Sequence, residues 1–182
     1  FRSDLLSGSG SADIVLDGSL PVDMSQYQWI VVLGAIICFI VAFGIGANDV
    51  ANAFATSVGS KSLTMRQAVC IAAVCEFGGA VLLGSRVTDT VRKGITSQNL
   101  FNQDEAHLGL LMVGMLSVLM SVAAWLLIAT RLEMPVSTTH SCIGGIIGMA
   151  LAANGQDAVN WDKVQEVVIS WFLSPLLSAL LA

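Results

Sequence analysis

Charged residues are scarce in this chain, and basic residues are the scarcer kind. Of the 182 residues, 12% are charged and 55% are hydrophobic, and the mean hydropathy is +0.78. These values fall outside the normal range of soluble domains and are typical of membrane proteins. The 8 Lys and Arg against 13 Asp and Glu give a net charge of −5 without a basic patch, so we expect no nucleic-acid partner.

We expect no signal peptide in the first residues of this sequence, and the cysteines show no pattern of a metal site. Residues 1–28 contain no apolar core of the length that a signal peptide requires, and 1–27, rich in Ser, Gly and Asp, predict a polar N-terminal tail. The cysteines lie in apolar stretches without the paired spacing of a metal site. We interpret them as small buried hydrophobic residues and expect no disulfides between Cys38, Cys70, Cys75 and Cys142.

Five hydrophobic segments predict an all-α polytopic membrane protein. They begin at Trp29, Ala68, Leu108, Val136 and Val164. Polar connections are predicted at 59–66, 86–107 and 154–163. Because at least two segments are interrupted by polar residues, we expect broken helices. The odd number of segments and the short last one indicate a fragment of a longer protein.

The first polar cluster, 44–53 (GIGANDVANA), follows an apolar run with no loop between them, and the chain stays apolar afterwards. Irregular backbone at membrane depth survives only where it is buried in protein or lines a polar cavity. We therefore predict a helix break at Gly44 and Gly46 with an ion or substrate site at the break.

Three side chains of this cluster carry oxygen ligands suited to an alkali cation or to hydrogen bonding. On a helix, Asn48 and Asn52 share a face, and Asp49 lies about 100° round from Asn48. The alternative is that Asn48 caps a helix and Asp49 points to an aqueous vestibule. The apolar flanks favour a binding site over this alternative.

Glu76 interrupts the second apolar segment. A charge at the centre of a membrane helix costs about 2.5–3.5 kcal/mol on insertion scales, so the carboxyl group must be paired, protonated or exposed to water. A protonated Glu76 bonded to a neighbouring backbone is one interpretation. We favour a role in cation coupling.

The second polar cluster is 135–141 (PVSTTHS), which follows a sharp boundary at Glu133. Proline fits the first turn of a helix, and the N–H groups that follow have no partner within the helix, so they form an anion site. Ser137, Thr138 and Thr139 add hydroxyl donors without adding charge. Such clusters also serve as helix caps, and His140 is as compatible with packing as with a ligand role.

Together the clusters place acidic side chains near an oxyanion site. Asp49 and Glu76 would repel an oxyanion that binds at the hydroxyl-rich helix start. A net-negative cavity holds phosphate only if cations enter with it, so these residues imply cation coupling. Uptake of phosphate that is independent of both sodium and the proton gradient would refute this hypothesis.

The stretches 46–53 (GANDVANA) and 135–140 (PVSTTH) resemble the two signatures of the inorganic phosphate transporter (PiT) family of sodium–phosphate symporters. The resemblance covers about 29–182 and extends to 66–68, 76–77, 92–95 and 170–177. It implies an all-helical transporter of two inverted repeats, whose site lies near the membrane midplane. It also implies no enzymatic activity and no cofactor beyond co-transported sodium.

By this resemblance, phosphate is bound by Ser137, Thr138, Thr139 and Asn48, while Asp49, Asn52 and Glu76 serve sodium binding and coupling. The only metal expected is sodium, and His140 is a further candidate ligand. The resemblance also suggests an extracellular N-terminus. We expect location in the plasma membrane, the lipid bilayer as surroundings, and a homodimer as one option.

Only one copy of each signature is present, so residues 28–182 are predicted to be the first transmembrane repeat of a C-terminally truncated transporter. Its missing second repeat would complete the site. Other options are a proton-coupled phosphate or sulfate symporter, an intramembrane hydrolase that uses a serine with His140, and a purely structural helix bundle. Against the hydrolase, no third, orienting group is evident.

Overall fold

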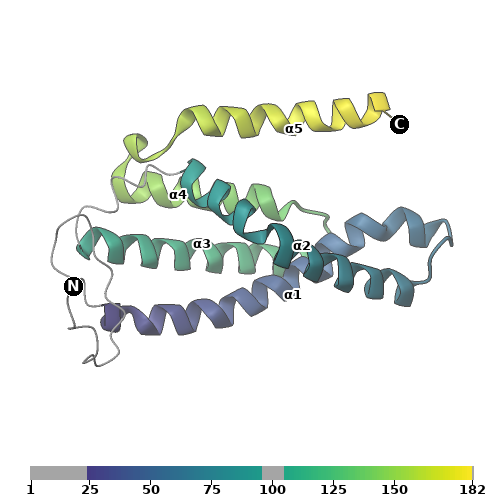
Figure 1. Ribbon diagram of the computed structural model, residues 1–182, viewed down its shortest axis with the longest axis horizontal. Coiled ribbons are helices and arrows are strands. Elements are labelled where there is room, and N and C mark those ends of the chain that lie inside the picture. Colours follow the sequence, from purple (N-terminus) through teal and green to yellow (C-terminus); the bar gives the residue numbers. More distant parts are fainter. Residues whose placement is uncertain (1–23, 96–104, 182) are drawn as a thin grey trace, which may run out of the picture.

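The computed structural model describes residues 24–95 and 105–181, which are almost entirely helical (Figure 1). Each of the five predicted hydrophobic segments corresponds to one α-helix, although the fourth, predicted from Val136, becomes helical only at Thr138; this confirms the all-α fold class. Over the described residues, α1, α2, α3 and α5 are long and apolar enough to cross a membrane, whereas α4 has only 17 residues. In chain order the elements are η1 (Met24–Tyr27), α1 (Gln28–Gly59), α2 (Met65–Ile95), α3 (Glu105–Arg131), α4 (Thr138–Asn154), η3 (Gln156–Ala158) and α5 (Trp161–Leu181).

Helix α3 is the centre of the packing and lies between α1 and α4 (Figure 1). Apolar side chains are buried on two of its faces, one against α1 and the other against α4. Toward α1 the buried cluster is Ile30, Ile37, Leu116 and Ala123. Toward α4 it includes Val118, Val122, Leu126, Ile143 and Ile146. Helix α5, in contrast, has no buried residue.

Glycines let these helices approach closely. A Cβ atom added to Gly44 of α1 would lie 3.1 Å from the Cβ of Leu126, and one added to Gly145 of α4 would lie 2.9 Å from Cγ1 of Val118. Leu126 is fully buried, so its side chain has no free space to move into. Small residues at such contacts are typical of packed membrane helices, in which backbones come close together.

The predicted helix break at Gly44 and Gly46 is wrong, because α1 runs unbroken from Gln28 to Gly59. A glycine within a helix costs only about 1 kcal/mol relative to alanine. Here Gly44 packs against Leu126 as part of the α1–α3 contact, which offsets that cost. The polar side chains of the cluster find partners without any change in the backbone, as described below.

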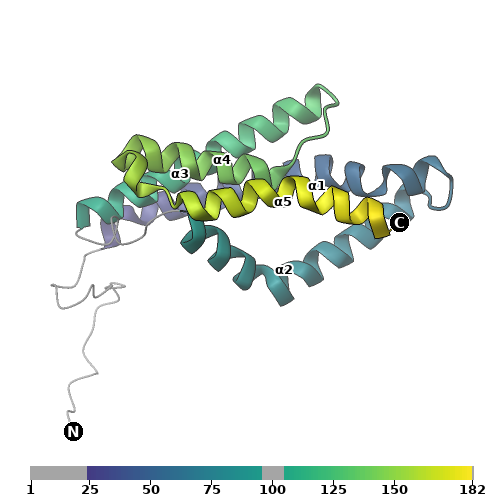
Figure 2. The same ribbon diagram turned by 90° about the horizontal axis from the view of Figure 1, so that it is seen from above.

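The interruption of helical structure lies instead between α3 and α4, where 132–137 form a turn and an extended segment. Glu133 has a positive φ of 57°. Ser137 is in the extended region, with φ of −94° and ψ of 117°. Helix α2 is continuous but visibly bent (Figure 2), with the pair Gly78 and Gly79 in its middle third. Glycine pairs are a common site of helix bends.

Two predicted loops are shorter than expected, because helices extend into them. Helix α2 continues to Ile95 and α3 begins at Glu105, so the predicted loop 86–107 is wrong at both ends. Within 154–163, η3 and the first turn of α5 replace part of the loop, and the Asn160 N–H donates to the Ile95 carbonyl at 2.9 Å. The predicted tail, 1–27, lies outside the described residues except for η1.

Candidate functional site

The turn after α3 is a Schellman motif, a helix end closed by two backbone hydrogen bonds. The Met134 N–H donates to the Ala129 carbonyl at 2.9 Å, and the Glu133 N–H donates to the Thr130 carbonyl at 3.1 Å. The positive φ of Glu133 redirects the chain, and Pro135 then favours extended backbone. The chain therefore leaves α3 sharply and presents 134–138 to α1.

Helix α4 begins with a side-chain cap. Ser137 Oγ accepts a hydrogen bond from the His140 N–H at 3.3 Å, and the Ser141 hydroxyl donates to the Ser137 carbonyl at 2.9 Å. Capping by Ser137 occupies one lone pair of its oxygen. The hydroxyl hydrogen remains able to donate to an anion, so capping and ligand roles are compatible for Ser137.

Asn48 of α1 joins this turn to the first polar cluster. Its Nδ2 donates to the Met134 carbonyl at 3.0 Å and more weakly to Thr130 Oγ1 at 3.4 Å. Its Oδ1 accepts from the Val136 N–H at 3.1 Å and from Asn52 Nδ2 at 3.2 Å. Asn48 is the one buried polar or charged side chain of the described residues and is 6% exposed.

Asp49 lies beside Asn48 and contacts the start of α4. The Thr138 hydroxyl donates to Asp49 Oδ2 at 2.9 Å, and Asp49 is half-buried. Thr138 is the first residue of α4, so the carboxylate lies near the positive end of the helix dipole, which stabilises a negative charge. Residues from the two polar clusters, 89 positions apart, thus meet in one site.

The other predicted site residues lie at different distances from this contact. Asn52 is joined to it through Asn48, whereas Thr139 is exposed at the first turn of α4. Glu76 is exposed on α2 and lines a groove of about 630 Å³ between α1 and α2. Within the described residues, no hydrogen bond or ion pair joins Glu76 to the Asp49–Thr138 pair.

His140 uses its backbone and its ring in different directions. Its N–H binds Ser137 Oγ, but its ring meets the Trp171 ring of α5 edge to face, with centroids 4.2 Å apart and planes at 77°. An imidazole in this position packs against an aromatic ring. In the structure the ring is therefore engaged with α5, and the serine contact is made by the main chain.

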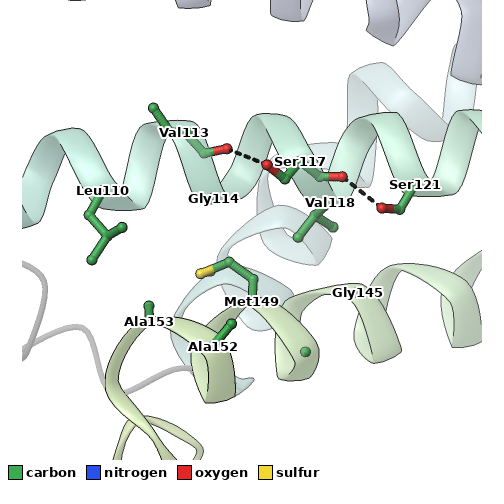
Figure 3. A pocket seen from close by; sticks show the side chains of 11 residues that line it. Leu110, Val113, Gly114, Ser117, Val118, Ser121, Gly145, Met149, Ala152 and Ala153 are labelled. Atoms are coloured by element: carbon green, nitrogen blue, oxygen red, sulfur yellow. Dashed lines mark hydrogen bonds between the residues drawn. The ribbon is translucent and has the colours of Figure 1, made fainter.

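A second groove, between α3 and α4, does not belong to the polar site. It has a volume of about 450 Å³, and its lining is mostly small and apolar (Figure 3). Its two hydroxyls, Ser117 and Ser121, donate to carbonyls one turn back in their own helix at 3.0 and 2.9 Å. Both hydroxyl hydrogens are therefore used within α3, so neither serine offers a ligand a free hydroxyl donor in this groove.

The partners that hold Asn48 could not be recognised from the sequence. Thr130, the Met134 carbonyl and the Val136 N–H lie 82, 86 and 88 positions from Asn48. The boundary at Glu133 signalled a turn, but two of these partners are backbone groups, which carry no residue-type signal. Only the packing of α1 against α3 brings them together.

Comparison with known proteins gives a consistent result. Residues 45–182 match the model of the phosphate transporter family. The chain is 44% identical over 154 residues to the sodium-dependent phosphate transporter 1 of Mus musculus, which covers 85% of this chain and 22% of that protein. It is 43% identical over 150 residues to a sodium-dependent phosphate transporter of Plasmodium falciparum, a match that covers 82% of this chain and 22% of that protein.

The solved structure of a sodium-dependent phosphate transporter is similar to this chain, with a TM-score of 0.76 and 46% sequence identity; the match covers 84% of this chain and 37% of that one. The chain thus spans 22% to 37% of the length of these three proteins. Together with the apolar helices, these matches identify an integral membrane protein, and the proteins that it matches are transporters and not enzymes.

Proposed function

Because the chain belongs to the phosphate transporter family, we propose that the full-length protein carrying it is a sodium-coupled symporter of inorganic phosphate. In this proposal residues 28–182 form the first transmembrane repeat, and a second, inverted repeat completes the site. The names of the mouse and Plasmodium relatives support both phosphate as substrate and sodium as driving ion.

The observation that carries the proposal is the hydrogen bond between the Thr138 hydroxyl and the Asp49 carboxylate. It places an acidic side chain at the start of a hydroxyl-rich helix, where N–H groups and the helix dipole favour an anion. An oxyanion that approaches Thr138 meets the negative charge of Asp49. A cation between the two resolves this conflict, and sodium is the cation that the relatives' names indicate.

The roles follow from this arrangement. Asp49 offers sodium a carboxylate oxygen, and Asn52 contributes its Oδ1, because its Nδ2 is already bonded to Asn48. Ser137 and Thr139 donate hydroxyl hydrogens to phosphate, and Thr138 donates its backbone N–H, because its single hydroxyl hydrogen is bonded to Asp49. Glu76 lies in the α1–α2 groove, apart from the bonded set, and we propose that it acts in coupling at a distance from phosphate. His140 packs on Trp171 and supports the helix start.

Three further features belong to the proposal. The full-length protein resides in the plasma membrane, its N-terminus is extracellular, and it functions either alone or as a homodimer. Labelling of an introduced N-terminal cysteine in intact cells tests the orientation, and cross-linking in membranes tests the dimer.

Transport by reconstituted full-length protein tests the central proposal. We expect uptake of radiolabelled phosphate into proteoliposomes to fall by about tenfold or more when choline replaces sodium, because the carboxylate then repels the unaccompanied anion. Asp49→Asn should cause a loss of similar size for another reason: it removes the repulsion, but it also removes the charged ligand of the sodium that drives uptake. The matched control is Asp162→Asn, which removes an exposed carboxylate in the first turn of α5 and should leave uptake unchanged.

Two additions separate the alternatives. Excess unlabelled sulfate should leave phosphate uptake intact, whereas unlabelled phosphate should compete with it. Uptake that persists in choline but collapses with a proton ionophore would contradict sodium coupling and indicate a proton-driven symporter.

A further inference from the structure

The carboxamide of Asn48 has no hydrogen-bonding capacity left for a ligand. An amide side chain donates two hydrogen bonds and accepts two at its carbonyl oxygen. Nδ2 of Asn48 donates to Met134 and Thr130, and Oδ1 accepts from Val136 and Asn52. A phosphate ion could bind Asn48 only by displacing one of these partners, since the side chain is 6% exposed.

The two bonds to the extended segment have the pattern of a backbone pairing. The Met134 carbonyl and the Val136 N–H flank Pro135 and are both held by the same carboxamide. Among uncharged side chains of this length, only an asparagine amide places a donor and an acceptor side by side, as a peptide group does. Pro135 itself has no N–H, so the segment loses no donor on its other side.

The neighbours of these groups in sequence form the proposed transport site. Asp49 follows Asn48 on α1, and Thr138 follows Val136 by two positions at the start of α4. Fixing 134–136 against α1 therefore also fixes the distance of 2.9 Å between the Thr138 hydroxyl and the Asp49 carboxylate. Without that anchor, the turn after Glu133 would depend on its local hydrogen bonds and on the single long-range bond between Thr138 and Asp49.

We infer that Asn48 is a positioning residue, which clamps the α3–α4 turn onto α1 so that Thr138 meets Asp49, and that it does not bind phosphate itself. This inference replaces the ligand role that the sequence suggested for Asn48. Its significance for transport rests on the proposed function, but the clamp itself exists without any ligand.

Hydrogen exchange in phosphate-free full-length protein separates the two roles. The Val136 N–H is held by Asn48 Oδ1, and Pro135 contributes no amide, so peptides covering 132–141 report on the clamp. In Asn48→Ala, exchange in 132–137 should become about tenfold faster, as expected for a lost buried hydrogen bond. The control is Asn52→Ala on the same face of α1, which should change exchange there by less than about twofold.

A second variant keeps the test decisive if Asn48→Ala loosens the whole protein. Asn48→Asp has nearly the same shape and retains an acceptor for Val136, but it cannot donate to Met134. Exchange in 132–137 should therefore be faster than in the wild type, by about threefold, and slower than in Asn48→Ala. If Asn48 only binds phosphate, both variants should show the wild-type exchange rate in 132–137 in phosphate-free protein. That result would overturn the inference.

Transport gives the second readout. Asn48→Ala and Asn48→Asp should both lower the maximal rate of phosphate uptake by about tenfold, because fewer molecules hold Thr138 against Asp49. Thr130→Val removes only the weakest bond to Asn48, at 3.4 Å, and should stay within about twofold of the wild type. If the wild type takes up no phosphate yet the exchange differences persist, symport fails and the clamp stands.

Discussion

Two turns of this chain end their helices in the same way and differ in what holds them. After α1, the Lys61 and Ser62 N–H groups donate to the Val58 and Ser57 carbonyls, and after α3, the N–H groups of Glu133 and Met134 make the equivalent bonds. Both turns place a non-glycine residue in the left-handed region, with φ of 63° at Lys61 and 57° at Glu133.

The helices that follow also begin alike. Thr64 and Gln67 form a capping box at the start of α2, in which the Gln67 N–H donates to Thr64 Oγ1 and the Thr64 N–H donates to Gln67 Oε1. At α4, Ser137 accepts from the His140 N–H in the same register. The ring of His140, however, contacts Trp171 and does not return to the cap.

The two turns differ in how far apart in sequence the residues are that their hydrogen bonds join. The described bonds of the α1–α2 turn join residues no more than six positions apart, and the turn is largely exposed. The α3–α4 turn is held in addition by Asn48 and Asp49 across 86 to 89 positions. Local sequence suffices to make a turn, but long-range bonds fix its position, and only the turn with a fixed position carries the polar site.

The largest effect should come from removing one hydroxyl in each turn. Thr138→Val deletes the donor to Asp49 and should lower phosphate uptake by about tenfold to a hundredfold, since hydrogen bonds to charged groups contribute about 1.5–3 kcal/mol. Thr64→Val deletes only a local cap and should leave uptake unchanged. Phosphate uptake by proteoliposomes measures both variants. Equal losses of uptake would contradict the claim that only the α3–α4 turn carries the polar site.

Capping and ligand roles of Ser137 can be separated by two substitutions. Ser137→Ala removes the cap and should lower the free energy of unfolding by about 1 kcal/mol, whereas Ser137→Gly should cost only a few tenths. Both lack the hydroxyl that is proposed to bind phosphate, so both should raise the KM for phosphate. Thermal unfolding and uptake kinetics give the two readouts. Normal uptake by Ser137→Gly would show that Ser137 only caps α4 and does not bind phosphate.

The contact between His140 and Trp171 should contribute modestly. His140→Phe keeps an aromatic ring there and should change stability little, whereas His140→Ala should lose about 0.5–1.5 kcal/mol. Thermal unfolding of full-length protein tests this difference. A severe loss of uptake in His140→Phe, with stability intact, would show that the imidazole acts on the substrate and not on α5.

The smallest effect should come from replacing Lys61 and Glu133, which have positive φ, by glycine. The two substitutions should change stability equally. Lys61→Gly and Glu133→Gly should each raise the free energy of unfolding by up to about 1 kcal/mol, because glycine adopts positive φ without steric cost. Thermal unfolding measures both. A destabilised Glu133→Gly beside a stabilised Lys61→Gly would reveal a function for the Glu133 side chain that its backbone geometry does not show.

The contrast between the turns also explains what the sequence could predict. The helical segments followed from runs of apolar residues, and the pairing of Asp49 with the hydroxyls after Pro135 followed from the chemistry of two conspicuous clusters. The break at Gly44 was mispredicted because composition does not tell what packs on a glycine, here Leu126. The bonds of Asn48 to a carbonyl and an N–H of a distant turn could not be predicted, because backbone groups are the same in every residue.

Binding of inorganic phosphate to the purified full-length protein, titrated once in sodium and once in choline, tests the central claim most directly. If sodium neutralises Asp49 at the start of α4, its presence should tighten phosphate binding by about tenfold or more, and phosphate should tighten sodium binding by the same factor. Asp49→Asn should abolish this coupling. Equal phosphate affinities in sodium and choline for the wild-type protein would contradict the account.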